Sequence, residues 1–207
     1  MLDLLRQHLL LRLGANTDQL DEVLGHFRPL RLQAGEQLLR QGDICSHVYF
    51  IAKGCLQVYV YDSRYNETTR DVVLEDHWCS ELISFGQRLP ATENIRAIED
   101  ADLLAINLAG FQTLLTTVPP FAQVYQQILE ASHASGVERV NALVSLTALE
   151  KIRWVSLHRP ELLTRVSQQR HRMRVGEGDA ARPVDEQGGV VQQVEHRTFS
   201  GREAFKR

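Results

Sequence analysis

Cysteines, prolines and long apolar runs are all scarce in this sequence of 207 residues. The three cysteines, Cys45, Cys55 and Cys79, show no C-x-x-C spacing and cannot all pair with one another, which argues against a zinc site or a disulfide framework. No run approaches the roughly 18 apolar residues that would span a bilayer, and the N-terminus lacks a small-residue cleavage pattern. We therefore expect a cytoplasmic protein with no metal and no membrane contact.

Catalytic motifs are missing as well. The sequence has no G-x-S-x-G and no Ser or Cys in a recognisable nucleophile turn. The histidines are too sparse for a cupin enzyme, and a charged turn before an apolar run explains the acids Glu99, Asp100 and Asp102. We expect no enzymatic activity.

Turn residues divide much of the sequence into short apolar runs. Leucines recur at helical spacing over residues 2–13, whereas residues 30–108 hold seven short runs separated by turns that include Gly35, Gly42 and Gly54. Short strands at such close spacing predict a closed β-roll or a small sandwich.

Helical periodicity returns after residue 108, and Pro119-Pro120 begins a helix predicted to run to about Leu146. Such a helix is longer than a roll of this size can cover, so we expect its free part to form the seam of a homodimer. The alternative is a helix folded back on its own domain. The predicted seam residues are Phe121, Tyr125, Ile128, Ser132, Ser135 and Val140.

The stretch LRLQAGEQLLRQGDICSHVYFIAKGCLQVYV places the three turn glycines between apolar strands. In this it resembles the cyclic-nucleotide-binding β-roll of the Crp-Fnr family of bacterial transcription regulators. The resemblance covers roughly residues 20–168 and implies an α+β fold, with a double-stranded β-helix or jelly roll flanked by helices. The implied domains are the N-terminal helices and roll over residues 1–118, the dimerisation helix over 119–146 and the remnant of a winged-helix, helix-turn-helix domain over 147–168.

Residues 169–207 depart from the family pattern. In the family this region completes a helix-turn-helix, which needs two apolar-faced helices around a tight turn. Five glycines and scattered apolar residues predict an irregular tail instead. Either the tail has replaced the DNA-binding motif, or a shift of the reading frame near codon 168 has removed it. The abruptness of the change favours the shift.

The first residues of the ligand pocket that the resemblance implies differ from the family pattern. The family begins its phosphate-binding segment with a glycine and an acid, and the matching residues here are Ser80 and Glu81, followed by Leu82. Ser135 is adjacent to the positions that meet adenine in the cyclic-AMP branch. Ser80, Glu81 and Thr92 either bind a different, less anionic ligand or form hydrogen bonds that close a turn.

The cation of that pocket is missing. The family's phosphate-binding arginine is replaced by Ala91, with Thr92 beside it, while Arg88 and Arg96 lie outside the register of the motif. A charge-assisted contact worth roughly 1.5 to 3 kcal/mol is therefore lost. We expect no tight binding of cyclic AMP and assign no cofactor.

The resemblance implies a transcriptional regulator in which a sensor roll controls a dimeric DNA-binding domain. Because the recognition motif is absent, we expect a homodimer with weak or no DNA binding and an unidentified small-molecule effector. The alternative is a stand-alone ligand-sensing or protein-interaction module that does not contact DNA.

Overall fold

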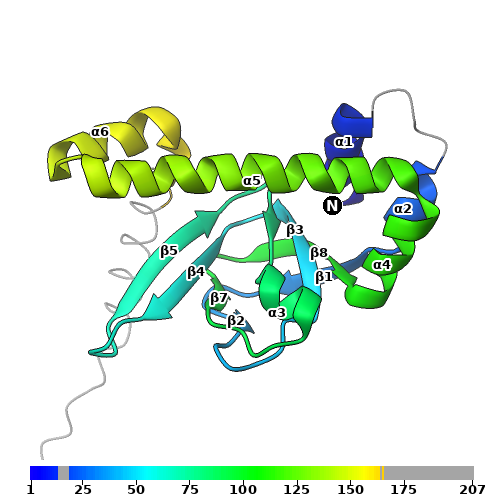
Figure 1. Ribbon diagram of the computed structural model, residues 1–207, viewed down its shortest axis with the longest axis horizontal. Helices are drawn as coiled ribbons and strands as arrows, with labels where there is room; N and C mark the ends of the chain where they lie inside the picture. Colours follow the sequence, from blue (N-terminus) through cyan, green and yellow to red (C-terminus); the bar gives the residue numbers. More distant parts are fainter. Residues whose placement is uncertain (14–18, 164, 166–207) are drawn as a thin grey trace, which may run out of the picture.

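Two four-stranded antiparallel sheets form a β-roll that one long helix crosses (Figure 1). The computed structural model describes residues 1–13, 19–163 and 165, so the predicted tail over 169–207 lies outside the described residues. The strand orders are β1-β8-β3-β6 and β2-β7-β4-β5. The strands are β1 (Arg28–Leu32), β2 (Gln37–Leu39), β3 (His47–Lys53), β4 (Leu56–Tyr61), β5 (Glu67–Val73), β6 (Trp78–Cys79), β7 (Asn94–Ala97) and β8 (Ala101–Asn107).

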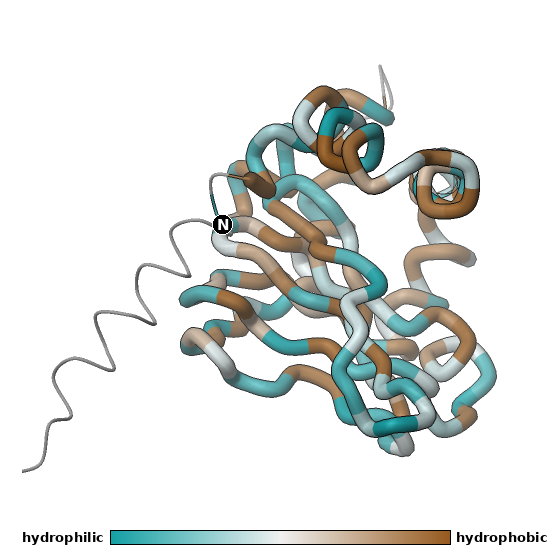
Figure 2. Tube along the Cα trace, turned by 90° about the vertical axis from the view of Figure 1, so that its left-hand side faces the viewer, coloured by the Kyte–Doolittle hydropathy of each residue, from teal (hydrophilic) through white to brown (hydrophobic). Residues whose placement is uncertain are grey.

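Each of the seven apolar runs forms a strand, which confirms the predicted roll. The short β6 was not predicted, because two residues carry no alternating pattern. Figure 2 shows hydrophobic and hydrophilic residues mixed along the chain of the roll. β3, β4 and β8 each contain four consecutive buried residues, so both sides of these strands are covered. The largest fully buried side chains of the strands are Phe50, Ile51, Leu56, Val58, Ile95, Leu103, Leu104 and Ile106.

The three predicted turn glycines all adopt positive φ angles, 83° at Gly35, 95° at Gly42 and 85° at Gly54. L-residues with side chains rarely adopt this region, so the prediction of turns at these positions is confirmed. Gly54 has a second constraint, because a Cβ placed there would lie 2.6 Å from the carbonyl oxygen of Asp100. The chain therefore has room only for glycine at this corner of the roll.

Helices of the described residues flank the roll. The helices are α1 (Leu2–Leu13), α2 (Leu20–Gly25), α3 (Leu82–Gln87), α4 (Leu108–Thr117), α5 (Pro119–Ser145) and α6 (Ala148–His158). The long helix matches its predicted span closely, and it ends where the Glu150 carboxylate accepts the Thr147 N–H and so caps the start of α6. None of the described helices is long and apolar enough to cross a membrane.

Helix α1 docks on the roll through Leu5 and Leu9, which are fully buried, and through His8. His8 Nδ1 lies 2.7 Å from an Asp76 carboxylate oxygen, and the indole N–H of Trp78 donates to His8 Nε2 over 2.9 Å. Because Nε2 accepts, Nδ1 carries the proton and donates to Asp76. Both nitrogens of a buried imidazole are thus satisfied in its neutral form.

Helix α5 runs along the roll, and α6 folds back beside its C-terminal end (Figure 1). The first turns of α5 belong to the protein core: Phe121 and Val124 are buried, and Tyr125 and Ile128 pack against the same core. The prediction that Phe121 lies in an intermolecular seam is therefore wrong, because its ring is only 3% exposed within its own chain. It packs edge-on against Phe111 of α4 instead.

Candidate functional site

The candidate site is the segment over residues 80–93, called the cassette below, which contains α3 and leads into β7. Glu81 is the N-cap of α3, and its carboxylate accepts the backbone N–H of Ser84 over 2.8 Å. The Ser80 hydroxyl donates to the carbonyl of His47 on β3. Both side chains therefore make internal hydrogen bonds, which is the alternative role expected from the sequence.

Ala91 lies in a short backbone ladder at the other end of the cassette. Its N–H donates to the carbonyl of Asp43, and its carbonyl accepts from the N–H of Gly42, both over 2.8 Å. The Ala91 methyl is buried, whereas Thr92 and Leu82 are exposed. Position 91 is thus fixed by its backbone while its side chain offers no cation to a ligand.

Arg88 and Arg96, the two other arginines near the motif, are bound elsewhere. Arg88 donates to the carbonyl of Cys45. Arg96 pairs with Glu67 and places its guanidinium 4.7 Å from the centre of the Tyr59 ring. These contacts hold Arg96 over β4, away from a role in the cassette.

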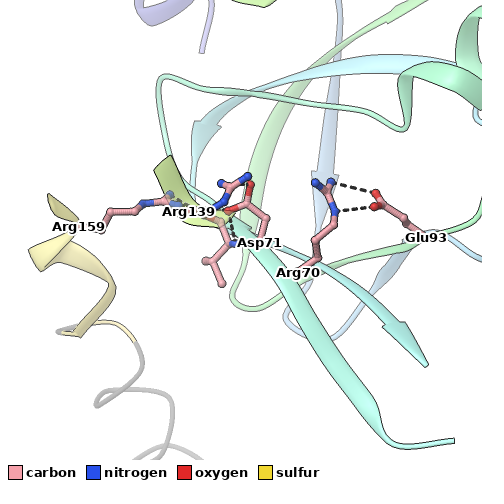
Figure 3. A network of polar contacts seen from close by, with 6 residues as sticks. Arg70, Asp71, Glu93, Arg139 and Arg159 are labelled. Carbon is pink, nitrogen blue, oxygen red and sulfur yellow. Dashed lines mark hydrogen bonds and ion pairs between the residues drawn. The ribbon is translucent and has the colours of Figure 1, made fainter. Parts of the chain in front are cut away.

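The cation that does reach the cassette is Arg70 of β5, which sequence reasoning missed. Its Nε and Nη2 atoms lie 2.5 and 2.9 Å from the two carboxylate oxygens of Glu93, in a bidentate ion pair (Figure 3). The register of β4 with β5 shifts here: Val58 pairs with Asp71 and Tyr59 with Thr69, so Arg70 is the extra residue of a β-bulge. Bulges of this kind redirect a side chain, and no glycine marked this one in the sequence.

The electrostatics of the cassette are dominated by carboxylates. Burial raises the pKa of Glu93, Arg70 opposes that shift, and the nearby carboxylates of Glu81 and Asp71 add to it. An anionic ligand entering here would meet this negative charge and would compete with Glu93 for Arg70. The arrangement suits a neutral or cationic group better than a phosphate.

Within residues 1–13, 19–163 and 165, no group of three or more His, Cys, Asp or Glu side chains is placed to hold a metal ion. The three cysteines are free and buried, and burial raises the pKa of the Cys55 thiol to about 11. The pocket residue Ser135 is exposed on α5.

The outer half of α5 carries the rest of the predicted seam. Ser132, Ser135 and Val140 are exposed, and Val140 is 58% accessible. Further exposed apolar residues follow on α5 and α6, namely Val137, Leu143, Val144, Leu149 and Ile152. Along α5, Val137, Val140 and Val144 recur at helical spacing and form one apolar stripe, called the valine stripe below.

The sequence of the roll matches a known protein family. Residues 29–118 match the family described as "Cyclic nucleotide-binding domain". No curated protein sequence matches the chain. The match includes the whole roll and α4, but it ends before α5.

Solved structures share the fold at low sequence identity. A cyclic nucleotide-binding domain from Methylobacillus flagellatus KT has a TM-score of 0.58 at 14% identity, over 70% of this chain and 86% of that one. The sensor domain of the transcriptional regulator DNR from Pseudomonas aeruginosa has a TM-score of 0.52 at 20% identity, over 70% and 94% of the two chains.

The catabolite activator protein of Thermus thermophilus has a TM-score of 0.55 at 19% identity, over 66% of this chain. The match spans 62% of the Thermus chain. At these identities the comparisons establish a common fold. Residues 29–118 therefore match the cyclic nucleotide-binding domain family, and the chain shares the fold of the Thermus catabolite activator protein and of the DNR sensor domain.

Proposed function

We propose that the protein is a Crp-Fnr-like transcriptional regulator, in which the roll senses a small molecule and controls a dimeric DNA-binding region. The observation that carries this proposal is the order of parts along the chain: a cyclic nucleotide-binding domain, then the long α5 with an exposed valine stripe, then α6. The described residues supply no catalytic constellation, and the proposal assigns the protein no enzymatic activity.

The ligand of the sensor is less anionic than a cyclic nucleotide. Ala91 provides no cation, Arg70 is already paired with Glu93, and Glu81 caps α3. A phosphate would therefore have to displace a bidentate carboxylate from Arg70, which costs affinity. The exposed Thr92 carries a hydroxyl group for a hydrogen bond to a neutral ligand, and the Ser80 hydroxyl, which donates to His47, can still accept one.

The valine stripe is the proposed homodimer seam. Val140 is 58% exposed, and the exposed Val137 and Val144 on the same side of α5 leave an apolar face open to a second helix. Ser132 and Ser135 are also exposed but lie on other sides of the helix. A charge placed in such a seam would face its copy across the two-fold axis. Replacement of Val140 by Asp is expected to weaken the dimer by roughly 100-fold or more, because like charges would be desolvated together.

Sedimentation velocity over a concentration series measures this effect. Gln112→Asp, at an exposed position on α4, is the matched control and leaves the association unchanged. A Val140→Asp protein that sediments as the unmodified chain would show that the seam lies elsewhere.

The DNA-binding part of the proposal concerns residues 147–168. Helix α6 lies where the first helix of a helix-turn-helix domain is expected, and its N-terminus is capped by Glu150. Residues 169–207, where the recognition helix is expected, lie outside the described residues. We propose that this form recognises DNA weakly.

The second candidate function is a stand-alone sensor or interaction module. Selection of duplex DNA from a random library, followed by footprinting with the 207-residue chain, separates the two candidates. A protected specific site supports the regulator, and no enrichment supports the module. Resequencing the gene around codon 168 complements this, because a second frame encoding two amphipathic helices around a glycine turn would restore the regulator.

A further inference from the structure

Two adjacent residues of β5 connect different parts of the protein. Arg70 binds Glu93 in the cassette, and Asp71 binds Arg139 of α5 and Arg159 at the end of α6 (Figure 3). The side chains of Arg70 and Asp71 diverge in the figure, one toward the cassette and the other toward the helices. One short piece of strand thus contacts both the candidate ligand site and the helical end of the chain.

The Asp71 cluster is built as a clamp. Each carboxylate oxygen takes one arginine: Oδ2 lies 2.6 Å from Arg139 Nη1, and Oδ1 lies 3.2 Å from Arg159 Nη1. Arg159 also donates to the carbonyl of Val72 over 2.7 Å. All three charged side chains are largely buried, with exposures of 15% for Asp71, 23% for Arg139 and 19% for Arg159. Ion pairs shielded in this way are less screened than surface pairs.

Helix α6 depends on such polar contacts for its position. None of the residues Ala148–His158 is buried, so the helix has no apolar anchor in the core. Beyond the helix, Arg165 pairs with both Glu75 and Glu99 of the roll. Segments held mainly by polar contacts at their ends open at low free-energy cost.

The position of β5 makes it movable. It lies at the edge of its sheet and pairs only with β4, and the bulge at Arg70 interrupts that pairing. An edge strand can shift at a bulge without breaking a second ladder of hydrogen bonds. Arg70 and Asp71 are adjacent at this bulge, so the two ion-pair clusters share one short piece of backbone.

We propose that β5 couples the cassette to α6: the Arg70–Glu93 ion pair keeps the bulge in the form that lets Asp71 clamp Arg139 and Arg159. Loss of the Arg70–Glu93 pair loosens the clamp and frees α6 from the roll. The inference rests on the proposed function only where it treats the cassette as the ligand site. A ligand that draws Glu93 away from Arg70 would release α6 by the same route.

Hydrogen–deuterium exchange of the whole chain, read over the amides of α6, tests the coupling without DNA or ligand. Failure of the proposed function would thus leave this readout intact. Three variants are compared with the unmodified protein: Glu93→Gln, Asp71→Asn and the control Asp21→Asn. The control removes a carboxylate from the exposed Arg6–Asp21 ion pair, far along the chain from the cassette. Unchanged protection of β3 and β8 establishes that the roll remains folded.

We expect α6 to exchange roughly threefold to tenfold faster in both Glu93→Gln and Asp71→Asn, and unchanged in Asp21→Asn. Faster exchange in Asp71→Asn with no change in Glu93→Gln would overturn the coupling, because the Asp71 ion pairs would then not depend on the Arg70–Glu93 ion pair. No change in either variant would overturn it as well. If Asp71→Asn fails to fold, Arg159→Gln opens the clamp from outside the roll and takes its place.

Discussion

Acidification is expected to loosen α1 from the roll, because His8 can accept a proton only by losing a hydrogen bond. Its Nε2 accepts the indole N–H of Trp78, and its Nδ1–H already donates to Asp76. A protonated imidazole would point an N–H at the N–H of Trp78. The ring is 2% exposed, so no water can take the place of the lost acceptor without movement of the helix.

The sign and size of the effect follow from linkage. Burial lowers the pKa of His8 below its ordinary value of 6.5; the hydrogen bond to Asp76 opposes that shift, while the charge of Arg12 and the nearby His77 add to it. The unfolded chain therefore binds a proton that the folded chain does not, so stability is fully present above pH 6.5 and is lost as the pH falls below it. For one histidine that stays neutral in the fold, the loss reaches at most about 1.4 kcal/mol at pH 5.5.

Urea denaturation followed by circular dichroism at pH 7.5, 6.5 and 5.5 measures this loss. Trp78→Phe is the matched variant, because it keeps an aromatic ring against Phe50 but removes the N–H that opposes protonation of His8. Its stability should fall less steeply with acid than that of the unmodified protein. A histidine resonance absent from His8→Gln that titrates at or above pH 6.5, or equal slopes for both proteins, would refute the reasoning.

Two further predictions concern the ligand site and the roll. Calorimetric titration with cyclic AMP and cyclic GMP is expected to give no saturable heat at micromolar concentrations, since the loss of the arginine contact at Ala91 weakens binding by roughly 10- to 100-fold; micromolar affinity would contradict this. Gly54→Ala is expected to lower the free energy of unfolding by roughly 2 kcal/mol or more, because the new Cβ meets the Asp100 carbonyl at 2.6 Å in a backbone of positive φ. In the control Gly86→Ala the Cβ meets no atom within 4 Å, and equal unfolding midpoints for both variants would contradict the steric account.

The sequence by itself determined the roll and the long helix. The glycines at 35, 42 and 54 fix where the chain reverses, because their positive φ angles are a local property of each residue. Short apolar runs bounded by turn residues predicted the strands, and helical periodicity predicted α5. The replacement at Ala91 was visible in the same way, since it concerns a single position in a motif.

Only the tertiary structure decided which side chains meet. Arg70 and Glu93 are brought together by a bulge in β5, and Asp71 and Arg159 by the return of the chain after α6. Glu81 became a helix cap because α3 begins beside it, and Phe121 became core because α4 covers it. Helical periodicity alone gave no reason to single out His8. In the structure His8 is a neutral buried group between Asp76 and Trp78. These outcomes depend on strand register and helix docking, which join residues far apart in the chain and leave no local pattern in the sequence.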